Sequence, residues 1–369
     1  MDKTVKVALW GAGSMADYHV QGFRQAGAEV VAILDKNLER AKAYAARQDI
    51  PLAMQTLDEL FAKVKPDGIS IITPNKFHKE LSIEALKRKM HVFCEKPPAL
   101  SAAEVREMKA AAVKAHRILT FDFNNRCREE VHALMDYIHA GEVGPIQSGQ
   151  ALWIRRAGIP GFGGWFTNKS MAGGGPLIDL LHMLDLALYF MGYPEPEYAL
   201  SQTFDDKIQD ARFKGPWGIP DMENGVCDVE NACHAFLRFK TGQVLFVRSS
   251  WAEMVEREEI YVRVQGTKAG AIIRRRFGSD GIDITSRDDA KLFRVEHGRQ
   301  VNSSLIYMPD VDMGRTSSPA NFVRAIRGEE EPLVKPDEAI RLMHIIDGIY
   351  LSASSGRPVK YGKTGVAPL

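Results

Sequence analysis

The sequence begins with a short apolar run that ends in a glycine-rich turn. Val5–Ala16 reads Val-Lys-Val-Ala-Leu-Trp-Gly-Ala-Gly-Ser-Met-Ala, so a strand pattern leads into Gly-x-Gly-x-x-Ala and then into a helix-forming stretch. Gly11 allows the tight turn, and Gly13 has no side chain, so a pyrophosphate can approach the backbone. The free N–H groups at the helix start then favour phosphate. The pattern predicts a dinucleotide-binding turn that includes Ser14 and Met15.

A second apolar run, Glu29–Leu34, ends in the acidic residue Asp35. Asp35 follows Ala16 by about 20 residues, where a carboxylate that binds the adenosine ribose is expected. Such a carboxylate accepts hydrogen bonds from the ribose hydroxyls and repels a 2′-phosphate, so Asp35 favours NAD over NADP. Lys36 and Arg40 are close in sequence, which leaves use of NADP open. The alternative is a glycine turn in another α/β protein, with Asp35 as a turn residue.

Strand and helix patterns alternate through the first third of the chain. Thr56–Glu59 and Ser101–Glu104 have the spacing of a capping box, which marks the start of a helix. The other expected elements are strands at 68–73, 91–94 and 118–123 and helices at 38–48, 78–89 and 101–116. Strands separated by helices of about 10 to 15 residues predict a parallel, doubly wound sheet, in which ligands bind beyond the carboxyl ends of the strands.

The pattern changes after about Asn124. The expected elements are helices at 126–140, 176–191, 320–327 and 337–355 and strands at 146–155, 230–239, 244–250, 259–265 and 271–276. The spacing of the last four strands is typical of an antiparallel meander. The helix that begins near Pro176 can cover one face of this sheet, and a partner subunit can cover the other. The polar segment Asp205–Asp228, rich in Gly and Pro, is expected to be an excursion loop.

The composition limits the class of protein. A chain of 369 residues predicts two domains. It holds 48 Lys and Arg against 47 Asp and Glu, so a nucleic-acid partner is not expected. The four cysteines include no Cys-x-x-Cys pair, which argues against a disulfide framework or a zinc site and fits a cytoplasmic location. The first strand pattern leaves no room for a secretory signal, and no apolar run is long enough for a membrane span.

Several motifs together resemble the Gfo/Idh/MocA family, named for glucose–fructose oxidoreductase and inositol dehydrogenase. Glu95-Lys96-Pro97 looks like the family signature, and the turn at Gly11, continued to His19, resembles its extended fingerprint. Thr73-Pro74-Asn75, followed by His78, is similar to its cofactor-ribose loop. The segment Gly173–Asp185 is similar to its second motif. The resemblance covers nearly the whole chain.

The resemblance implies an α/β fold with two parts. Residues 1–123 would form an NAD(P)-binding Rossmann domain with a doubly wound parallel sheet. Residues 124–369 would form a substrate-binding and oligomerisation α/β domain with a large open, mostly antiparallel sheet, whose C-terminal helix can pack back on the first domain. The expected cofactor-binding residues are Gly11, Gly13, Ser14, Met15, Asp35, Lys36, Thr73, Pro74, Asn75, His78, Glu95 and Lys96. The implied reaction is hydride transfer between NAD, with NADP as an alternative, and a sugar, inositol or related polyol. A homodimer or homotetramer is expected by analogy.

Three residues are candidates for the chemistry. Lys96 follows a predicted strand at the cofactor edge, and its ammonium group can donate a hydrogen bond to the reacting oxygen. His182 is the candidate acid/base, since imidazole titrates near neutral pH. Asp179 would orient that imidazole or hold a substrate hydroxyl. The alternatives are a surface lysine paired with Glu95, a core histidine, and a helix-capping aspartate.

The second motif departs from the family pattern, because His182 follows Asp179 by three residues and not four. On one continuous helix, a missing residue rotates the relation of the two side chains by about 100°. A looser turn after Asp179 could absorb the difference. Asp185 would lie about 120° around such a helix from Asp179, so a metal site is not expected there.

The substrate surface is expected to include Asn124, Arg155 and Trp165, together with Asp179 and His182. Aromatic faces and hydrogen-bonding side chains suit a polyol, whereas the arginine could instead recognise a carboxylate or phosphate. Three functions stay open: a sugar or polyol dehydrogenase, a glycosidase that retains NAD, and a non-enzymatic NAD-binding regulator. The presence of both Lys96 and His182 argues against the regulator.

Overall fold

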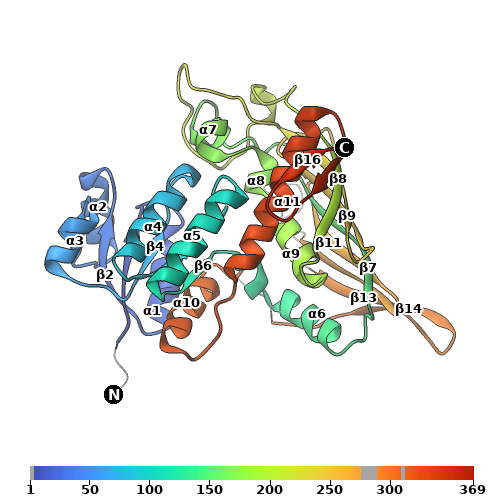
Figure 1. Cartoon of the computed structure of the whole chain (residues 1–369), viewed down its shortest axis with the longest axis horizontal. Helices are drawn as coiled ribbons and strands as arrows, with labels where there is room; N and C mark the ends of the chain where they lie inside the picture. The colour runs from blue at the N-terminus through green and yellow to red at the C-terminus, as the bar shows by residue number, and fades with distance from the viewer. Residues whose placement is uncertain (1–3, 276–288, 309–311) are drawn as a thin grey trace. The chain divides into compact units, whose positions relative to one another are not determined.

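The computed structural model describes residues 4–275, 289–308 and 312–369, drawn in Figure 1. By its internal contacts the chain forms two units. Unit 1 comprises Met1–Cys127 and Asp310–Ile340, and unit 2 comprises Arg128–Pro309 and Arg341–Leu369. The domain limits expected from the sequence, 1–123 and 124–369, place Asp310–Ile340 in the second part, whereas by internal contacts this stretch belongs to unit 1.

Unit 1 is built on a six-stranded parallel sheet. Its strands are β1 (Lys6–Trp10), β2 (Glu29–Leu34), β3 (Leu52–Met54), β4 (Gly68–Ile71), β5 (His91–Cys94) and β6 (Leu119–Phe121), in the order β3-β2-β1-β4-β5-β6. Every neighbouring pair is parallel, which confirms the predicted doubly wound sheet. The strand order reverses at β1 and β4, and ligands of this fold bind beside that point, at the carboxyl ends of the strands.

The helices of unit 1 are α1 (Ala16–Gln25), α2 (Leu38–Arg47), α3 (Leu57–Lys63), α4 (His78–Lys87), α5 (Ala102–Ala115) and α10 (Ser317–Arg327). Two of them, α3 and α5, start where the capping boxes predicted. The Thr56 hydroxyl accepts a hydrogen bond from the backbone N–H of Glu59 at the start of α3. Ser101 does the same for Glu104 at the start of α5. Each cap satisfies a backbone donor that has no partner within the helix.

Helix α10 reaches unit 1 from late in the chain and completes its hydrophobic core. Phe322 and Val323 belong to the same buried cluster as Phe23 of α1 and Phe93 of β5. The rings of Phe93 and Phe322 stack with their centroids 5.5 Å apart. Since these contacts join residues more than 200 positions apart, local sequence patterns carry no sign of them.

Unit 2 is built on a ten-stranded sheet that is antiparallel except where β10 runs parallel to β7. Its strands are β7 (Ile146–Ile154), β8 (Pro196–Phe204), β9 (Ala232–Phe239), β10 (Val244–Ser250), β11 (Glu259–Gly266), β12 (Ala269–Arg275), β13 (Asp289–Glu296), β14 (Arg299–Ser304), β15 (Val359–Tyr361) and β16 (Val366–Pro368). The order is β14-β13-β12-β11-β7-β10-β9-β8-β15-β16. The mostly antiparallel sheet is confirmed. Arg276, the expected end of β12, lies outside the described residues.

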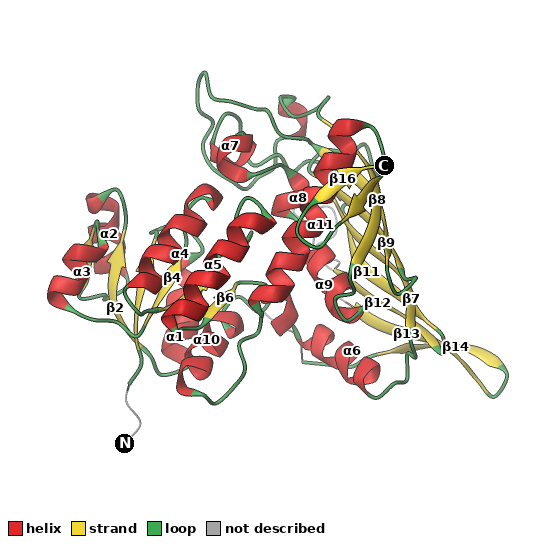
Figure 2. Ribbon diagram, in the orientation of Figure 1, coloured by secondary structure: helices red, strands yellow, loops and turns green. Residues whose placement is uncertain are grey.

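One face of the large sheet packs against helices, as Figure 2 shows for α6 (Glu129–His139), α8 (Pro176–Asp179) and α9 (His182–Phe190). The strands alternate accordingly: Leu245 and Val247 of β10 are buried, whereas Phe246 between them is about half exposed. The division of the chain after Ile340 falls inside α11 (Pro336–Ser355). In the part of the chain that the structure describes, no helix lies on the opposite face of the sheet.

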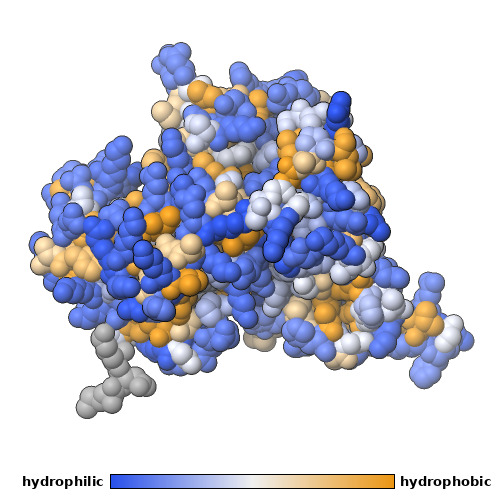
Figure 3. Space-filling view, in the orientation of Figure 1, coloured by the Kyte–Doolittle hydropathy of each residue, from blue (hydrophilic) through white to orange (hydrophobic). Residues whose placement is uncertain are grey.

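Hydrophilic side chains cover most of the face shown in Figure 3, and hydrophobic ones form scattered groups. All four cysteines are free thiols. Among the described residues, no single helix is long and apolar enough to cross a membrane; Lys169–Asp179 and His182–Phe190 reach that length only as a pair, which is bent by 53°.

Candidate active site

The glycine-rich turn connects β1 to α1, and its two glycines have different surroundings. Gly11 has φ +115°, and a Cβ placed on it would lie 2.0 Å from the backbone oxygen of Ile72, just after β4. A Cβ on Gly13 would have no atom within 4 Å. Gly13 and Ser14 are exposed, and Met15 is half-buried. The turn therefore needs Gly11 for its own fold and leaves open space over Gly13, which suits a pyrophosphate.

Asp35 follows β2, and its carboxylate is held in place from three sides. Oδ2 accepts a hydrogen bond of 3.0 Å from the N–H of Ala12, and Oδ1 accepts one of 2.8 Å from the N–H of Asn37. The Arg40 guanidinium donates to both oxygens, at 2.9 and 2.6 Å. Burial acts to raise the pKa of Asp35, but these hydrogen bonds outweigh it and hold the pKa below its usual value. Asp35 is thus an ionised carboxylate beside the glycine-rich turn; Lys36, the next residue, is exposed.

The segment after β4 is tied to the segment after β5 by one histidine. Asn75 opens a short 3₁₀ turn, Asn75–Phe77, directly after Thr73 and Pro74. The ring nitrogens of buried His78 lie 2.8 Å from the backbone oxygen of Thr73 and 2.7 Å from that of Pro97. Burial lowers the pKa of His78. The residues that resemble a cofactor-ribose loop and the Glu95-Lys96-Pro97 signature are therefore neighbours at one edge of the sheet.

Lys96 is half-buried directly after β5, and its backbone is fixed on both sides. The Glu95 carboxylate accepts a hydrogen bond of 3.0 Å from the N–H of Lys96. The peptide bond from Lys96 to Pro97 is cis, and the Pro97 oxygen contacts His78. Lys96 therefore has a defined position at the carboxyl edge of the parallel sheet, where ligands of this fold bind. Asn124, a predicted substrate residue, is buried in unit 1 and donates to the Met313 oxygen at 2.7 Å.

The helix expected at 176–191 is two helices, which corrects the sequence-based geometry. Helix α8 ends at Asp179 and α9 begins at His182, and the segment Lys169–Asp179 is bent by 53° relative to α9. The rotation of about 100° argued for one continuous helix therefore does not apply, nor does the angle of about 120° from Asp179 to Asp185. The three-residue spacing from Asp179 to His182 spans the break at Leu180–Leu181, where the chain changes direction.

Asp179, Arg155 and His182 lie in one group in unit 2 with tryptophans around them. The Trp251 indole N–H donates to Asp179 Oδ2 at 3.0 Å, and Arg155 Nη1 lies 3.7 Å from the same oxygen. The His182 and Trp153 ring centroids are 6.3 Å apart. The structure thus brings together three predicted site residues from β7, α8 and α9.

The Arg155 guanidinium lies between two indole rings. Its Cζ is 4.4 Å from the centroid of Trp217 and 5.1 Å from that of Trp153. Trp217 belongs to the expected excursion loop, which is loop except for the 3₁₀ turn Ala211–Phe213. The Phe166 ring stacks on the ring of the predicted residue Trp165, with centroids 3.8 Å apart. It also contacts the Trp217 ring edge-to-face, with centroids 6.0 Å apart. Aromatic faces beside a cation and a carboxylate can bind a sugar ring through stacking and hydrogen bonds.

Sequence reasoning missed Glu230, which builds the turn before α8. Its buried carboxylate accepts hydrogen bonds from the N–H groups of Gly175 and Leu177 at 3.0 and 3.3 Å and from the Tyr350 hydroxyl at 2.8 Å. Burial raises the pKa of Glu230. A Cβ on Gly174 would lie 1.9 Å from the Tyr350 oxygen, which explains a glycine there. The available signal for Glu230 was an acidic residue at the start of an apolar strand pattern. Trp217, Trp251 and Glu258, whose Oε1 lies 3.3 Å from Arg155 Nε, gave no such signal.

Comparison with known proteins agrees with this architecture. The family model described as "Oxidoreductase family, NAD-binding Rossmann fold" matches residues 5–123, and that of the "C-terminal alpha/beta domain" matches residues 137–361. The chain belongs to the Gfo/Idh/MocA oxidoreductase family. The predicted family is thereby confirmed, and so is the NAD-binding Rossmann fold.

The similar proteins include dehydrogenases of sugars and inositols. D-glucoside 3-dehydrogenase of Escherichia coli (strain K12) is 29% identical over 96% of this chain and 97% of its own length. Inositol 2-dehydrogenase of Arthrobacter sp. (strain FB24) is 27% identical over 79% of this chain and 87% of its own. The crystal structure of levoglucosan dehydrogenase with NADH and L-sorbose has the same fold, with a TM-score of 0.82 at 20% identity over 98% of this chain and 99% of that one.

Proposed function

We propose that this protein is an NAD-dependent dehydrogenase that oxidises a secondary hydroxyl group of a sugar, glycoside or polyol. The observation that carries the proposal is the position of Lys96: it follows β5 at the sheet edge where the glycine-rich turn and Asp35 also lie. The relatives that oxidise glucosides and inositols support this substrate class.

The residues present fit the cofactor. Gly13 leaves space at the turn, the turn leads into the N-terminus of α1, where the helix dipole favours phosphate, and Asp35 is ionised directly after β2. Bound NAD⁺ supplies the hydride acceptor. In this proposal the Lys96 ammonium group donates a hydrogen bond to the reacting oxygen and stabilises the charge that develops on it. His182 takes the hydroxyl proton, and Asp179 and Arg155 hold further hydroxyls of the substrate.

A substrate screen tests the proposal directly. Methyl α- and β-D-glucoside, myo-inositol, levoglucosan and D-xylose are each incubated with NAD⁺ and with NADP⁺, and the absorbance of the reduced cofactor is followed. We expect turnover with at least one of them and a preference for NAD⁺. Release of free glucose from a methyl glucoside without net NADH would point to the glycosidase alternative. Absence of any oxidation across a wider panel of sugars, with NAD bound, would contradict the dehydrogenase.

Asp35 gives a prediction about cofactor preference. We expect Asp35→Ala to lower the ratio of kcat/KM for NAD⁺ to that for NADP⁺ by roughly tenfold, because two ribose hydrogen bonds are lost and the repulsion of a 2′-phosphate is removed. Arg40 is then released from its ion pair and can bind that phosphate. Steady-state kinetics with both cofactors measure the ratio.

The matched control is Arg40→Ala, which should leave the preference for NAD⁺ in place. Combining it with Asp35→Ala should cancel the gain for NADP⁺. An unchanged ratio in Asp35→Ala would count against the assigned role of the carboxylate.

We also propose that the helix-free face of the large sheet pairs with a second copy of this chain. Four exposed apolar side chains lie on the adjoining strands β8, β9 and β10: Leu200, Phe204, Phe236 and Phe246. The two phenylalanine rings of β9 and β10 contact each other, with centroids 5.1 Å apart. Arg248 and Glu253 beside them carry opposite charges, so the same face can complement itself across a two-fold axis.

The test of this pairing is the mass in solution. We expect the wild type to sediment as a dimer or tetramer and Phe246→Asp to shift it toward a smaller species, because a carboxylate in an apolar interface is costly to desolvate. Val113→Asp, an equal change at an exposed apolar residue of unit 1, is the control and should keep the wild-type mass. A monomeric wild type at micromolar concentration would exclude the interface. The cytoplasmic location expected from the cysteines stays a prediction.

A further inference from the structure

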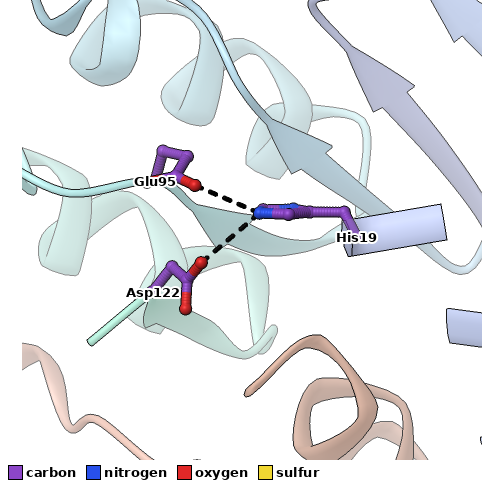
Figure 4. Close-up of side chains that lie close together, drawn as sticks. All are labelled: His19, Glu95 and Asp122. Atoms are coloured by element: carbon purple, nitrogen blue, oxygen red, sulfur yellow. Dashed lines mark hydrogen bonds and ion pairs between the residues drawn. The ribbon is translucent and has the colours of Figure 1, made fainter. Parts of the chain in front are cut away.

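Three ionisable side chains meet inside unit 1, below the sheet edge that carries Lys96. His19 comes from α1, Glu95 follows β5 and Asp122 follows β6, and Figure 4 shows all three pointing toward one another. His19 Nε2 lies 3.1 Å from Glu95 Oε1 and 3.4 Å from Asp122 Oδ2. The exposed fractions of the three residues are 0%, 7% and 1%, so the cluster is closed to solvent.

The second ring nitrogen of His19 is also engaged, since Nδ1 lies 2.7 Å from the Ser70 hydroxyl of β4. The ring is surrounded on its apolar side by Phe23 and Phe93, with centroids 6.2 and 5.2 Å away. His19 therefore contacts residues at the ends of three neighbouring strands, β4, β5 and β6. An imidazole buried this way has a fixed position and orientation.

The pKa values of the three groups in the cluster depend on one another. Burial acts to lower the pKa of His19, but the hydrogen bonds and charges of Asp122 and Glu95 raise it to about 9. Burial acts to raise the pKa of Glu95, but the hydrogen bond and charge of His19, together with the charge and backbone N–H of Lys96, hold it below the usual value. Burial and the Glu95 charge raise the pKa of Asp122. An imidazolium thus pairs with the Glu95 carboxylate, and Asp122 is the carboxyl group that more readily keeps a proton.

The Glu95 carboxylate links His19 to the backbone of the next residue, Lys96. Its Oε1 contacts His19, while its Oε2 accepts the hydrogen bond from the N–H of Lys96. One carboxylate therefore bridges a buried imidazole and the backbone of the proposed reactive lysine. His78 holds the other side of Lys96 through the Pro97 oxygen.

We propose that His19 is a positioning residue for Lys96: its imidazolium fixes the Glu95 carboxylate, which in turn fixes the backbone from which the Lys96 ammonium projects. The effect on turnover rests on the proposed function of Lys96, whereas the structural link does not. Because the hydrogen bond is charge-assisted on both sides, it is stronger than a bond between neutral groups. Losing it allows the segment after β5 to open more often.

Hydrogen exchange of the Glu95–Pro98 segment tests the structural link without any substrate. Pro97 and Pro98 have no N–H, so exchange in this segment reports two amides only: that of Glu95, which donates to the Ile71 oxygen, and that of Lys96. We expect His19→Leu to accelerate their exchange by about tenfold or more, as measured by mass spectrometry on the full chain. His19→Gln keeps a neutral donor of similar reach and should give an intermediate rate.

The matched control is Thr120→Val on β6. It removes the buried hydrogen bond from the Thr120 hydroxyl to the Val334 oxygen in the same unit, but it does not touch Glu95. We expect the control to lower the melting temperature while the two amides keep their wild-type exchange. If His19→Leu does not fold, His19→Gln is compared with the wild type instead. We then expect the Glu95 and Lys96 amides to exchange a few fold faster in His19→Gln.

Kinetics with the best substrate of the screen, and with the same substrate deuterated at the carbon that is oxidised, add the link to chemistry. We expect His19→Leu to lower kcat by about tenfold, to raise the deuterium isotope effect because the hydride step becomes slower, and to leave the KM for NAD⁺ nearly unchanged. If Lys96→Ala is inactive while His19→Leu turns over like the wild type, the positioning role fails. If Lys96→Ala is itself fully active, the proposed function fails, and the exchange data alone decide the structural link.

Two results would overturn the inference. Unchanged exchange of the Glu95 and Lys96 amides in both His19 variants would show that the cluster does not hold the segment. The ligand atoms of His19, Glu95 and Asp122 lie within 4.8 Å of one another, so they could also chelate a metal ion. A stoichiometric transition metal in the purified wild type, lost in His19→Leu, would replace the hydrogen-bonded link with a metal site.

Discussion

Lys96→Ala should abolish turnover while the protein still binds NADH. Removing a donor that stabilises charge on a reacting oxygen typically lowers kcat by about 10²- to 10³-fold. Lys96 is half-buried at the carboxyl edge of the parallel sheet, and its backbone is fixed by Glu95 and through Pro97. The measurements are kcat with the best substrate of the screen and the Kd of NADH by fluorescence.

Lys109→Ala is the control for the loss of one positive charge in the same unit. Lys109 lies on α5 and pairs with Asp337. We expect its removal to leave kcat unchanged, because the pair is on the surface and contributes little. Turnover like that of the wild type in Lys96→Ala would refute the catalytic assignment, and loss of NADH binding would show that the lysine serves the cofactor instead.

Gly11→Ala should destabilise the fold, whereas Gly13→Ala should weaken cofactor binding and leave the fold intact. At Gly11 the added Cβ would lie 2.0 Å from the Ile72 oxygen, on a backbone with φ +115°. Ile72 donates its N–H to the Trp10 oxygen at the end of β1, so relief of the clash must separate β1 from β4. Backbone strain and overpacking of this kind together cost about 3 kcal/mol or more in free energy of unfolding.

Gly13 separates the two effects within the same turn. A Cβ there meets no atom within 4 Å, so we expect a melting temperature close to that of the wild type. The methyl group would fill the space expected for the pyrophosphate, and a cost of about 1 to 3 kcal/mol for overpacking corresponds to at least a tenfold higher Kd for NADH. Urea unfolding and NADH titration of both variants measure the two effects. Equal stability of the two variants would contradict the structural difference between the glycines.

The local patterns of the first third of the chain were sufficient to predict its parallel sheet except for the three-residue edge strand β3. Continuous apolar strands, two capping boxes and the glycine-rich turn each depend on residues that are close in sequence, and all agree on one parallel sheet. In the second part, strands β8 and β13 to β16 were missed. Strand β14 reads Arg-Gln-Val-Asn-Ser-Ser and is polar because it is at the edge of the sheet, so hydrophobic periodicity does not mark it.

The candidate site was predictable where it follows strand ends and not where it depends on distant partners. Asp35 and Lys96 follow apolar runs, which places them at one edge of the sheet by topology alone. The break at Leu180–Leu181 gave no local signal, because it contains no Gly or Pro and apolar residues such as Ile178 and Met183 lie close on both sides of it. Glu230 caps α8 from 55 residues away along the chain, and Arg155 meets Trp217 across a similar separation. Such contacts arise only when the whole unit has folded.

The return of α10 to the core of unit 1 has a consequence for fragments of this protein. A truncated chain that stops at residue 127 retains every strand of the parallel sheet but lacks the helix that covers Phe23 and Phe93. Those aromatic rings would face water in the fragment, which favours aggregation over a stable miniature nucleotide-binding protein. In the sequence, the first part of the chain looks like a self-sufficient module, but the unit is made of two separate segments of the polypeptide. Unit 1 can therefore be completed only after synthesis has passed residue 327.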